Sequence, residues 1–354
     1  MRARRERTVP RTTKRSRAGS RGRSRDARAL LLAAGGLALA GAVLAGSLPD
    51  GTDGHRKAGK HAVAEPADEH GVGTVAERET CDDGRDAAES YPAERVEGSA
   101  VEEIQDRGQL IVGIDQNSYL WGYRTPDTGE IVGFDIDLVE AIAEDLLDTP
   151  DPDIVFRAIP TSERINALQD GAVDMVVRAM SITCERWEHV AFSTAYFETG
   201  QQLLAPRNSP IDGFDASMAG QRVCSAEGST AAELLARESN GADLVTAPNH
   251  LDCLVQVQLG EADALMTDAA LGAGHVAQDP SMELIGEPLT EESYGVAFNA
   301  EATDLVAWVN AVLEDYREGG AQSRWTAAAE ARLEGYLYGE NEPPPSPPEP
   351  LYRN

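Results

Sequence analysis

Short apolar runs alternate with amphipathic segments through the middle of this 354-residue chain. Runs such as Leu110-Ile111-Val112-Gly113-Ile114 are typical of buried strands, whereas apolar positions spaced three or four apart predict helices. Strands are predicted at 110–114, 154–156, 174–177, 222–224, 244–245 and 264–266. Helices are predicted at 137–147 and 162–169, from 230, from 251, and at 302–318 and 321–334. This alternation indicates an α/β fold with mostly parallel sheets.

Two of the predicted helices begin with a capping-box pattern. Asp137 is followed three residues later by Glu140, and Thr230 by Glu233. A short polar side chain before an acidic one at this spacing satisfies two free backbone N–H groups of the first turn. We therefore place the two helix starts at Asp137 and Thr230.

The N-terminal segment has the pattern of an export signal. Residues 1–28 carry twelve Lys and Arg against two acids, and residues 29–46 are uncharged and mostly apolar. This order predicts a signal sequence over residues 1–46, and an uncleaved membrane anchor remains an alternative. Leu44-Ala45-Gly46-Ser47 resembles a lipobox, but Ser47 stands where a lipidated Cys is required, so we expect no lipidation. Cleavage is possible after Ala40 or Ala45.

Two further segments lack a globular pattern. Residues 47–100 are acidic and poor in large apolar side chains, which predicts a disordered spacer. Residues 338–354 contain NEPPPSPPEP, which predicts an extended proline-rich tail. Without residues 1–28, the chain keeps 19 of its 31 basic and 58 of its 60 acidic side chains. Such a surface repels phosphate backbones and disfavours nucleic-acid binding.

The chain has four cysteines, Cys81, Cys184, Cys224 and Cys253. An even number behind an export signal predicts two disulfides, and the number alone leaves three connectivities open. There is no CxxC pair and no cluster of His, so a zinc site is disfavoured. No motif predicts a cofactor.

Four phrases carry a resemblance to a known family. They are VGIDQNSY, GEIVGFDIDLVEAIA, LQDGAVDMVVRAMSITCERWEHVAFSTAYFETGQQLL and GEADALMTD. With them, residues 108–335 resemble bacterial solute-binding protein family 3, the polar amino-acid receptors of ABC importers, and most of all its actinobacterial glutamate-binding members. The resemblance implies a type II fold of two α/β lobes joined by a two-strand hinge. Lobe 1 would comprise 101–206 plus 294–337, and lobe 2 residues 207–293.

The resemblance also implies how an amino acid is held. Arg186 would bind the α-carboxylate, which a planar guanidinium can grip with two hydrogen bonds. Ser229 and Thr230 would contact the same carboxylate from a helix N-terminus, where free N–H groups and the helix dipole favour anions. The alternatives are a surface ion pair of Arg186 with a neighbouring Glu, and plain helix capping at Ser229 and Thr230.

The α-ammonium would be received by Asp268, Ser181 and the Ala179 carbonyl, with helix capping as the alternative role of Asp268. The ligand side chain would be read by Thr161 and Arg164, with a solvated helix face as the alternative role of Arg164. A carboxylate at Asp115 would repel glutamate and accept an amide.

Tyr119, in a cluster with Trp121 and Tyr123, is our candidate to cover the ligand. Glutamate is our first ligand, before glutamine, aspartate and asparagine.

The same resemblance implies the disulfide pairing Cys224–Cys253, because both fall in lobe 2 and actinobacterial relatives have a Cys at both places. The remaining pair is Cys81–Cys184.

The expected function is an exported, monomeric protein that delivers an amino acid to an ABC permease. The alternatives are a receptor that presents its ligand to a membrane sensor and, less favoured, a lyase or dehydratase on the same fold. None of the six His lies in a matched ligand motif, so we expect no enzyme.

Overall fold

The computed structural model describes residues 79–339 and 342–353. The predicted signal or anchor at 1–46, the lipobox-like Ser47 and the first part of the spacer lie outside these residues. None of the helices within the described ranges has the length and apolar character needed to cross a membrane.

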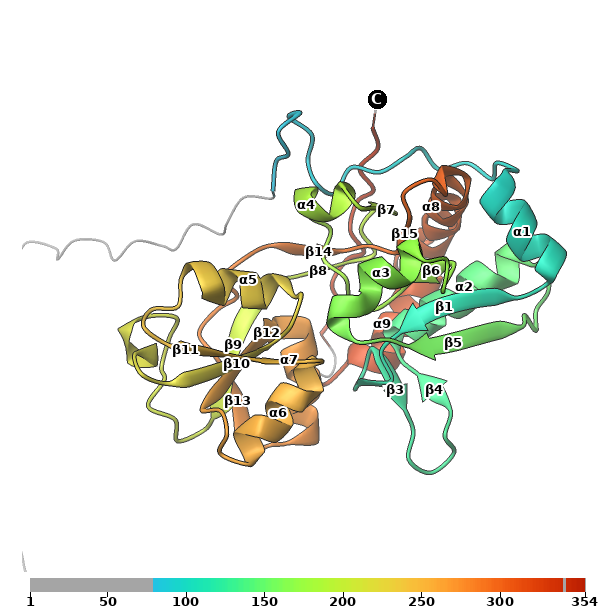
Figure 1. Ribbon diagram of the computed structural model, residues 1–354. Coiled ribbons are helices and arrows are strands. Elements are labelled where there is room, and N and C mark those ends of the chain that lie inside the picture. Colours follow the sequence, from blue (N-terminus) through green and yellow to red (C-terminus); the bar gives the residue numbers. More distant parts are fainter. Residues whose placement is uncertain (1–78, 340–341, 354) are drawn as a thin grey trace, which may run out of the picture. The chain divides into compact units, whose positions relative to one another are not determined.

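The first lobe is built on a five-stranded sheet in the order β5-β1-β6-β15-β7. Its first three strands are parallel, and β15 lies antiparallel between β6 and β7 (Figure 1). The strands are β1 (Leu110–Ile114), β5 (Ile154–Ala158), β6 (Met175–Val176), β7 (Val190–Phe192) and β15 (Ala297–Asn299). The helices of this lobe are α1 (Ser99–Arg107), α2 (Phe134–Leu146), α3 (Arg164–Gln169), α4 (Cys184–Trp187), α8 (Thr303–Arg317) and α9 (Arg324–Leu333), with 3-10 turns η1 (Thr161–Glu163) and η3 (Gly320–Gln322).

The second lobe has its own five-stranded sheet in the order β11-β10-β12-β9-β13. Here β9 runs antiparallel to both β12 and β13, while β10 is parallel to its two neighbours. The strands are β9 (Gln201–Pro206), β10 (Arg222–Ala226), β11 (Asp243–Ala247), β12 (Ala264–Asp268) and β13 (Met282–Ile285). The helices are α5 (Thr230–Arg237), α6 (His250–Gln258) and α7 (Ala269–Gln278), with the 3-10 turn η2 (Ala216–Met218).

Two antiparallel strands, β8 (Phe197–Thr199) and β14 (Glu292–Tyr294), connect the lobes. A small sheet of β2 (Asn117–Ser118), β3 (Gly122–Arg124) and β4 (Ile131–Val132) adds to lobe 1. The predicted two-lobe α/β class with a two-strand hinge is confirmed. The boundary predicted after residue 206 lies too late, because β9 pairs with the second sheet and the chain therefore leaves lobe 1 at β8.

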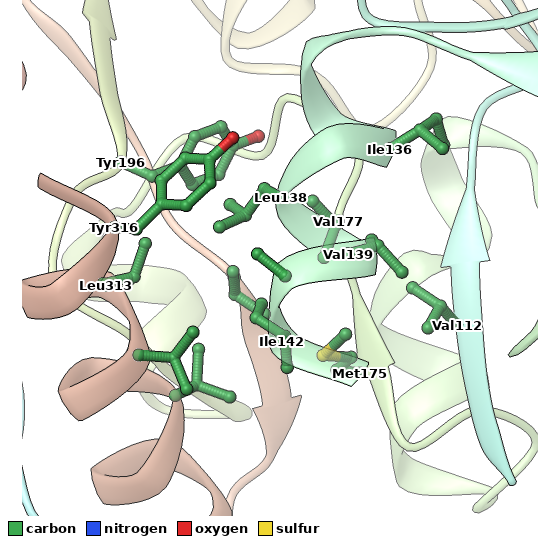
Figure 2. Packing of buried hydrophobic residues seen from close by; sticks show 14 of the residues in the cluster. Val112, Ile136, Leu138, Val139, Ile142, Met175, Val177, Tyr196, Leu313 and Tyr316 are labelled. Carbon is green, nitrogen blue, oxygen red and sulfur yellow. The ribbon is translucent and has the colours of Figure 1, made fainter. Parts of the chain in front are cut away.

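Helix α2 explains how the first lobe holds together. It lies between α8 and the sheet, with Leu138 on the side of Tyr316 and Val139 on the side of Val112 (Figure 2). These side chains are almost completely buried. Full burial of one such side chain contributes about 1.5–3 kcal/mol, so α2 fixes the sheet whose edge carries several candidate ligand residues.

Both predicted capping boxes are misplaced. Helix α2 begins at Phe134 with Gly133 as its N-cap, one turn before Asp137. Gly133 has φ 143°, and a Cβ there would meet the carbonyl of Trp121 at 2.0 Å, so the local backbone fixes the start of the helix instead. Helix α5 begins at Thr230, as predicted, but its N-cap is Ser229, whose Oγ accepts from the backbone N–H of Ala232.

The prediction of disorder does not hold for residues 79–100. The Ser90 side chain is fully buried and donates to the Phe192 carbonyl at 2.6 Å, and α1 begins at Ser99. The predicted tail is likewise ordered at its end, where Tyr352 forms a parallel bridge with Ser90. Each segment supplies the backbone partners that the other lacks, which composition alone does not reveal.

All four cysteines are paired. The bonds are Cys81–Cys184 and Cys224–Cys253, as the resemblance implied. The first ties residues that precede α1 to the start of α4, and the second joins β10 to α6 within lobe 2.

Candidate functional site

Nine of the ten predicted ligand-binding residues line one cavity, between the carboxyl ends of strands from both lobes. The nine are Asp115, Thr161, Arg164, Ala179, Ser181, Arg186, Ser229, Thr230 and Asp268. The sequence prediction therefore converges on one place in the fold.

Arg186 is held by short local contacts. It lies in the single-turn helix α4, where the Thr183 hydroxyl accepts from the Arg186 backbone N–H at 3.2 Å. Its Nη1 donates to the Ser181 carbonyl at 2.6 Å and its Nη2 to the Gly228 carbonyl of lobe 2 at 3.2 Å. The side chain is 6% exposed, and burial lowers its pKa. This differs from the alternative of a surface ion pair.

Arg164 contacts the same Gly228 carbonyl as Arg186 does. Its Nη2 donates to Gly228 at 3.0 Å, and its Nε donates to the Thr161 carbonyl at 2.8 Å. Arg164 is buried, and burial together with the charges of Arg186 and Arg178 lowers its pKa well below the ordinary value. Over the described ranges, no carboxylate forms an ion pair with Arg164 or Arg186. The cavity thus holds two buried cations without a direct ion pair, and the charge of Asp268 acts on both from a greater distance.

Two hydroxyl groups in the cavity are also unsatisfied. Thr161 Oγ1 and Ser118 Oγ are buried and form no hydrogen bond within the described part of the chain. Buried polar groups normally have partners, so both hydroxyls are positioned for an incoming polar molecule. Ser118 was not among the predicted residues.

Ser229 and Thr230 stand at the start of α5 but use their hydroxyls differently. Ser229 Oγ donates to the Ala226 carbonyl at 2.6 Å in addition to capping the helix. Thr230 Oγ1 donates to Glu292 of the hinge strand β14 at 3.3 Å. The Ser229 hydroxyl is therefore a helix cap, while the N–H groups of Thr230 and Ala231, which the cap does not use, remain available to an anion.

Asp268 ends β12 and occupies the N-cap position of α7, but its side chain caps no backbone N–H. Instead, the Tyr294 hydroxyl donates to its Oδ2 at 2.6 Å. Burial, with a further contribution from the charge of Glu292, raises the pKa of Asp268 to about 7. The capping alternative is thus not the role its carboxyl group has here.

Ala179 marks strain beside the acidic side of the cavity. Its φ is 42°, in the left-handed region that alanine rarely adopts. Its N–H donates to Asp135 at 3.1 Å, and the Tyr196 hydroxyl donates to the same carboxyl group at 2.8 Å. Burial raises the pKa of Asp135 to about 6. Asp135, which lines the cavity, lies two residues before the predicted helix start at Asp137 and was missed.

Arg178 and His250 are the other important residues that the sequence analysis missed. Arg178 forms an ion pair with Asp115 at 2.9 Å and donates to Asn249 of lobe 2 at 2.8 Å. Although burial acts in the opposite direction, Arg178 and His250 hold the pKa of Asp115 well below its usual range. Asp115 therefore does not present a free carboxylate to a ligand. Arg178 lies two residues after the end of β6, so the strand-edge rule that indicated Arg186 could also have indicated Arg178.

His250 begins α6 and is hydrogen-bonded to a second buried histidine. The distance between His250 Nδ1 and His275 Nε2 is 2.8 Å, and His250 Nε2 lies 3.5 Å from Asp115 Oδ2. Burial and the neighbouring imidazole lower the pKa of His275 well below the ordinary value. One histidine thus does line the cavity, contrary to the expectation from the motifs.

Tyr119 does not line the cavity. Its ring packs edge-on against Tyr123 and Tyr336, with centroid distances of 5.2 and 6.0 Å. Aromatic pairs are stabilised in this geometry, so Tyr119 is a packing residue. Among the residues that the structure covers, no group of three His, Cys, Asp or Glu side chains is arranged to hold a metal.

Comparisons with known proteins identify a family and several relatives of this chain. A family model described as bacterial extracellular solute-binding proteins, family 3, matches residues 110–327. The ABC transporter glutamine-binding protein GlnH of Bacillus subtilis is 33% identical over 217 residues, covering 61% of this chain and 79% of its own. Glutamate-binding protein GluB of Corynebacterium glutamicum is 30% identical over 228 residues, covering 61% and 77%.

A solved structure adds a fold comparison. The crystal structure of an ancestral amino acid-binding protein, a precursor of cyclohexadienyl dehydratase, aligns with a TM-score of 0.60 and 28% identity. The alignment covers 66% of this chain and all of that one. The family match therefore extends to the two-lobe architecture.

Proposed function

The chain belongs to the bacterial extracellular solute-binding proteins of family 3, and on that premise we propose that it captures glutamate in the cavity between its lobes and delivers it to an ABC importer. Its relatives include glutamine-binding and glutamate-binding proteins, one of them of an ABC transporter. The choice among these ligands rests on the charges of this chain's own cavity.

The observation that carries the proposal is the pair of buried guanidinium groups, Arg164 and Arg186, which converge on the Gly228 carbonyl. Burying a charge without a partner costs free energy, and an anionic ligand recovers it. Glutamate brings two carboxylates. Its α-carboxylate would pair with Arg186 and its γ-carboxylate with Arg164, close to the unsatisfied Thr161 hydroxyl.

The α-ammonium would lie on the opposite, acidic side, at Asp268. Burial disfavours the charged form of that carboxyl group, and an ammonium in contact restores it. Ser181, also buried in the cavity, and the Ala179 carbonyl would complete this subsite. The three ligand charges would then each meet a group of opposite sign.

Asp115 no longer argues against glutamate. Its negative charge is compensated by Arg178 at 2.9 Å, so its repulsion of a ligand carboxylate is reduced. Glutamine offers no charge to Arg164 and would leave that guanidinium unpaired. We therefore rank glutamate above glutamine, aspartate and asparagine.

Export is proposed from the basic and apolar N-terminal pattern, and the family's description as extracellular supports it. A monomer that presents ligand to a permease fits this setting, and a membrane sensor is the second candidate partner. Catalysis is a further candidate function, because the chain is similar to an ancestral precursor of a dehydratase.

A thermal-shift screen over the twenty amino acids, followed by titration calorimetry, tests the proposal. We expect glutamate to give the largest rise in melting temperature and to bind more tightly than glutamine. Product analysis after incubation with glutamate should return it unchanged. A preference for arginine, or no shift with any amino acid, would contradict the proposal.

A further inference from the structure

The two ends of the described chain meet beside the helix that carries Arg186. Residues 79–91 and 350–353, which we call the terminal clasp, run together past α4 (Figure 1). The Ser90 N–H donates to the Leu351 carbonyl at 3.0 Å, and the Arg353 N–H donates to the Ser90 carbonyl at 2.8 Å. Two segments far apart in the sequence thus form one short backbone ladder, a single parallel bridge.

This ladder is anchored in the core of lobe 1. The Ser90 hydroxyl donates to the Phe192 carbonyl of β7, and Asn310 of α8 donates to the same hydroxyl at 2.9 Å. Asn310 also donates to the Tyr91 carbonyl at 2.7 Å. Because Ser90 and Asn310 are fully buried, the clasp is fixed to the lobe rather than lying loosely on its surface.

From this anchored position, the clasp contacts both ends of α4. Cys81 is bonded to Cys184, the first residue of the helix, and Glu79 accepts from the Cys184 N–H at 3.2 Å. At the other end, the Trp187 indole N–H donates to the Ala87 carbonyl at 2.7 Å. The Arg353 guanidinium lies over the Trp187 ring, with 3.9 Å between its carbon and the ring centroid, and 4.7 Å from the ring of Tyr91.

Helix α4 has only four residues, and a single turn of helix has no stability of its own in water. Its position must come from tertiary contacts. The Trp187 ring packs on Phe192 at 5.5 Å and on other hydrophobic residues of lobe 1. The clasp adds the disulfide at the first residue of the helix, and the indole hydrogen bond and the guanidinium contact at its last. Arg186 lies between those ends, so whatever fixes Cys184 and Trp187 also fixes the guanidinium that faces the cavity.

We propose that the terminal clasp positions Arg186 for the α-carboxylate, with Cys81, Cys184, Trp187 and Arg353 as positioning residues that act through α4. The proposal rests on the proposed function, because it assigns Arg186 to an amino-acid ligand. It makes ligand affinity depend on segments that lie outside both sheets.

The test compares two arginines that both lie over an aromatic ring. Arg353→Ala removes the contact with Trp187. Arg324→Ala is the matched control, because Arg324 lies 5.8 Å from the Tyr316 ring, pairs with Glu144 and does not touch α4. Calorimetry on the full chain uses whichever amino acid the wild type binds, since every amino acid has the α-carboxylate. We expect Arg353→Ala to weaken binding about five- to tenfold and Arg324→Ala less than about twofold.

A double-mutant cycle separates positioning from general destabilisation. In an Arg186→Lys background, the effect of Arg353→Ala should shrink to less than about twofold. Hydrogen exchange of the Arg186 and Trp187 amides, which donate to the Thr183 hydroxyl and carbonyl, should be faster in Arg353→Ala than in the wild type. Cys81→Ser/Cys184→Ser provides a second variant with the same expected pattern.

Unchanged affinity and unchanged exchange in Arg353→Ala would overturn the clasp, and so would an equal loss of affinity in both backgrounds. Failure of the wild type to bind any amino acid would instead contradict the proposed function. In that case the exchange of the α4 amides still tests whether the clasp holds the helix.

Discussion

The hydroxyl of Tyr294, in the hinge strand β14, donates a hydrogen bond of 2.6 Å to Asp268 at the end of β12. Both side chains are buried. A hinge residue thus donates to the carboxyl group that we assign to the ligand ammonium. The protonation of Asp268 therefore depends on the position of the hinge strand.

Ligand affinity should depend on pH through Asp268. Burial raises the pKa of this carboxyl group to about 7, and an ammonium binds the deprotonated form. Affinity should therefore fall as the pH drops below about 7, approaching about tenfold per pH unit. Calorimetry in buffers of different ionisation enthalpy should show proton release near pH 7.

Tyr294→Phe provides the companion measurement. The lost hydrogen bond stabilises the carboxylate, so its removal should raise the pKa further and move the affinity decline to higher pH. Asp135→Asn serves as the control, because burial raises the pKa of Asp135 to about 6 while Tyr196 and Ala179 are its hydrogen-bond donors. If Asp135→Asn moves the pH at which affinity declines and Tyr294→Phe does not, the assignment of Asp268 to the ligand ammonium is wrong.

Arg186→Lys should weaken binding by about 2–5 kcal/mol, because a lysine cannot form the two parallel hydrogen bonds of a buried guanidinium. The control is Arg222→Lys, whose salt bridge with Asp263 lies at the surface and is worth about 0–1 kcal/mol. Titration calorimetry gives both affinities. If Arg186→Lys binds with wild-type affinity, Arg186 does not hold the α-carboxylate.

Selectivity should change when Arg164 is replaced. Arg164→Ala should reduce affinity for glutamate more than for glutamine, because only glutamate carries a charge on its side chain. The ratio of the two dissociation constants, measured under one set of conditions, is the relevant quantity. Equal losses for the two ligands would show that Arg164 does not read the ligand side chain.

Asp115→Asn tests the buried pair with Arg178. The substitution leaves the guanidinium uncompensated, so it should lower the free energy of unfolding by about 3–5 kcal/mol. The double variant Asp115→Asn/Arg178→Met should lower the free energy of unfolding by less than the single variant does. The single variant should also favour glutamate relative to glutamine, since the cavity gains positive charge. Denaturant unfolding and calorimetry measure the two effects.

The second disulfide should matter for stability. Cys224 and Cys253 are 29 positions apart, and closing a loop of this length stabilises a fold by about 3–4 kcal/mol on the chain-entropy model. Cys224→Ser/Cys253→Ser should lower the free energy of unfolding by that amount. An unchanged denaturation midpoint would contradict the model for this bond.

The sequence was most informative where local pattern and family motif agreed. The run Leu110 to Ile114 predicted β1, and the long third phrase placed Ala179, Ser181 and Arg186 at one edge of the sheet. It was least informative where distant segments supply the partner. Arg178 matters because Asp115 and Asn249 lie beside it, and Tyr119 was misassigned because its neighbour Tyr336 is 217 positions away.

The same limit explains the lobe boundary and the spacer. The apolar strand β9 could serve either sheet, and only its pairing with β12 and β13 decides which. Residues 79–98 are polar, as disordered segments are, but Ser90 and Cys81 have specific partners more than a hundred positions later. Composition measures the average of a segment and does not detect such single contacts.

The position of β15 between β6 and β7 has a consequence for the order in which the lobes can form. The second lobe has all five of its strands once residue 285 has been synthesised, since it is one continuous insertion from β9 to β13. The first lobe still lacks an interior strand at that point and cannot close its sheet until residue 299 has followed. In a chain that emerges from the ribosome or a secretion pore, the sheet of lobe 2 can therefore be completed before the sheet of lobe 1. The half of the binding cavity that lobe 1 contributes forms only after β15 has followed.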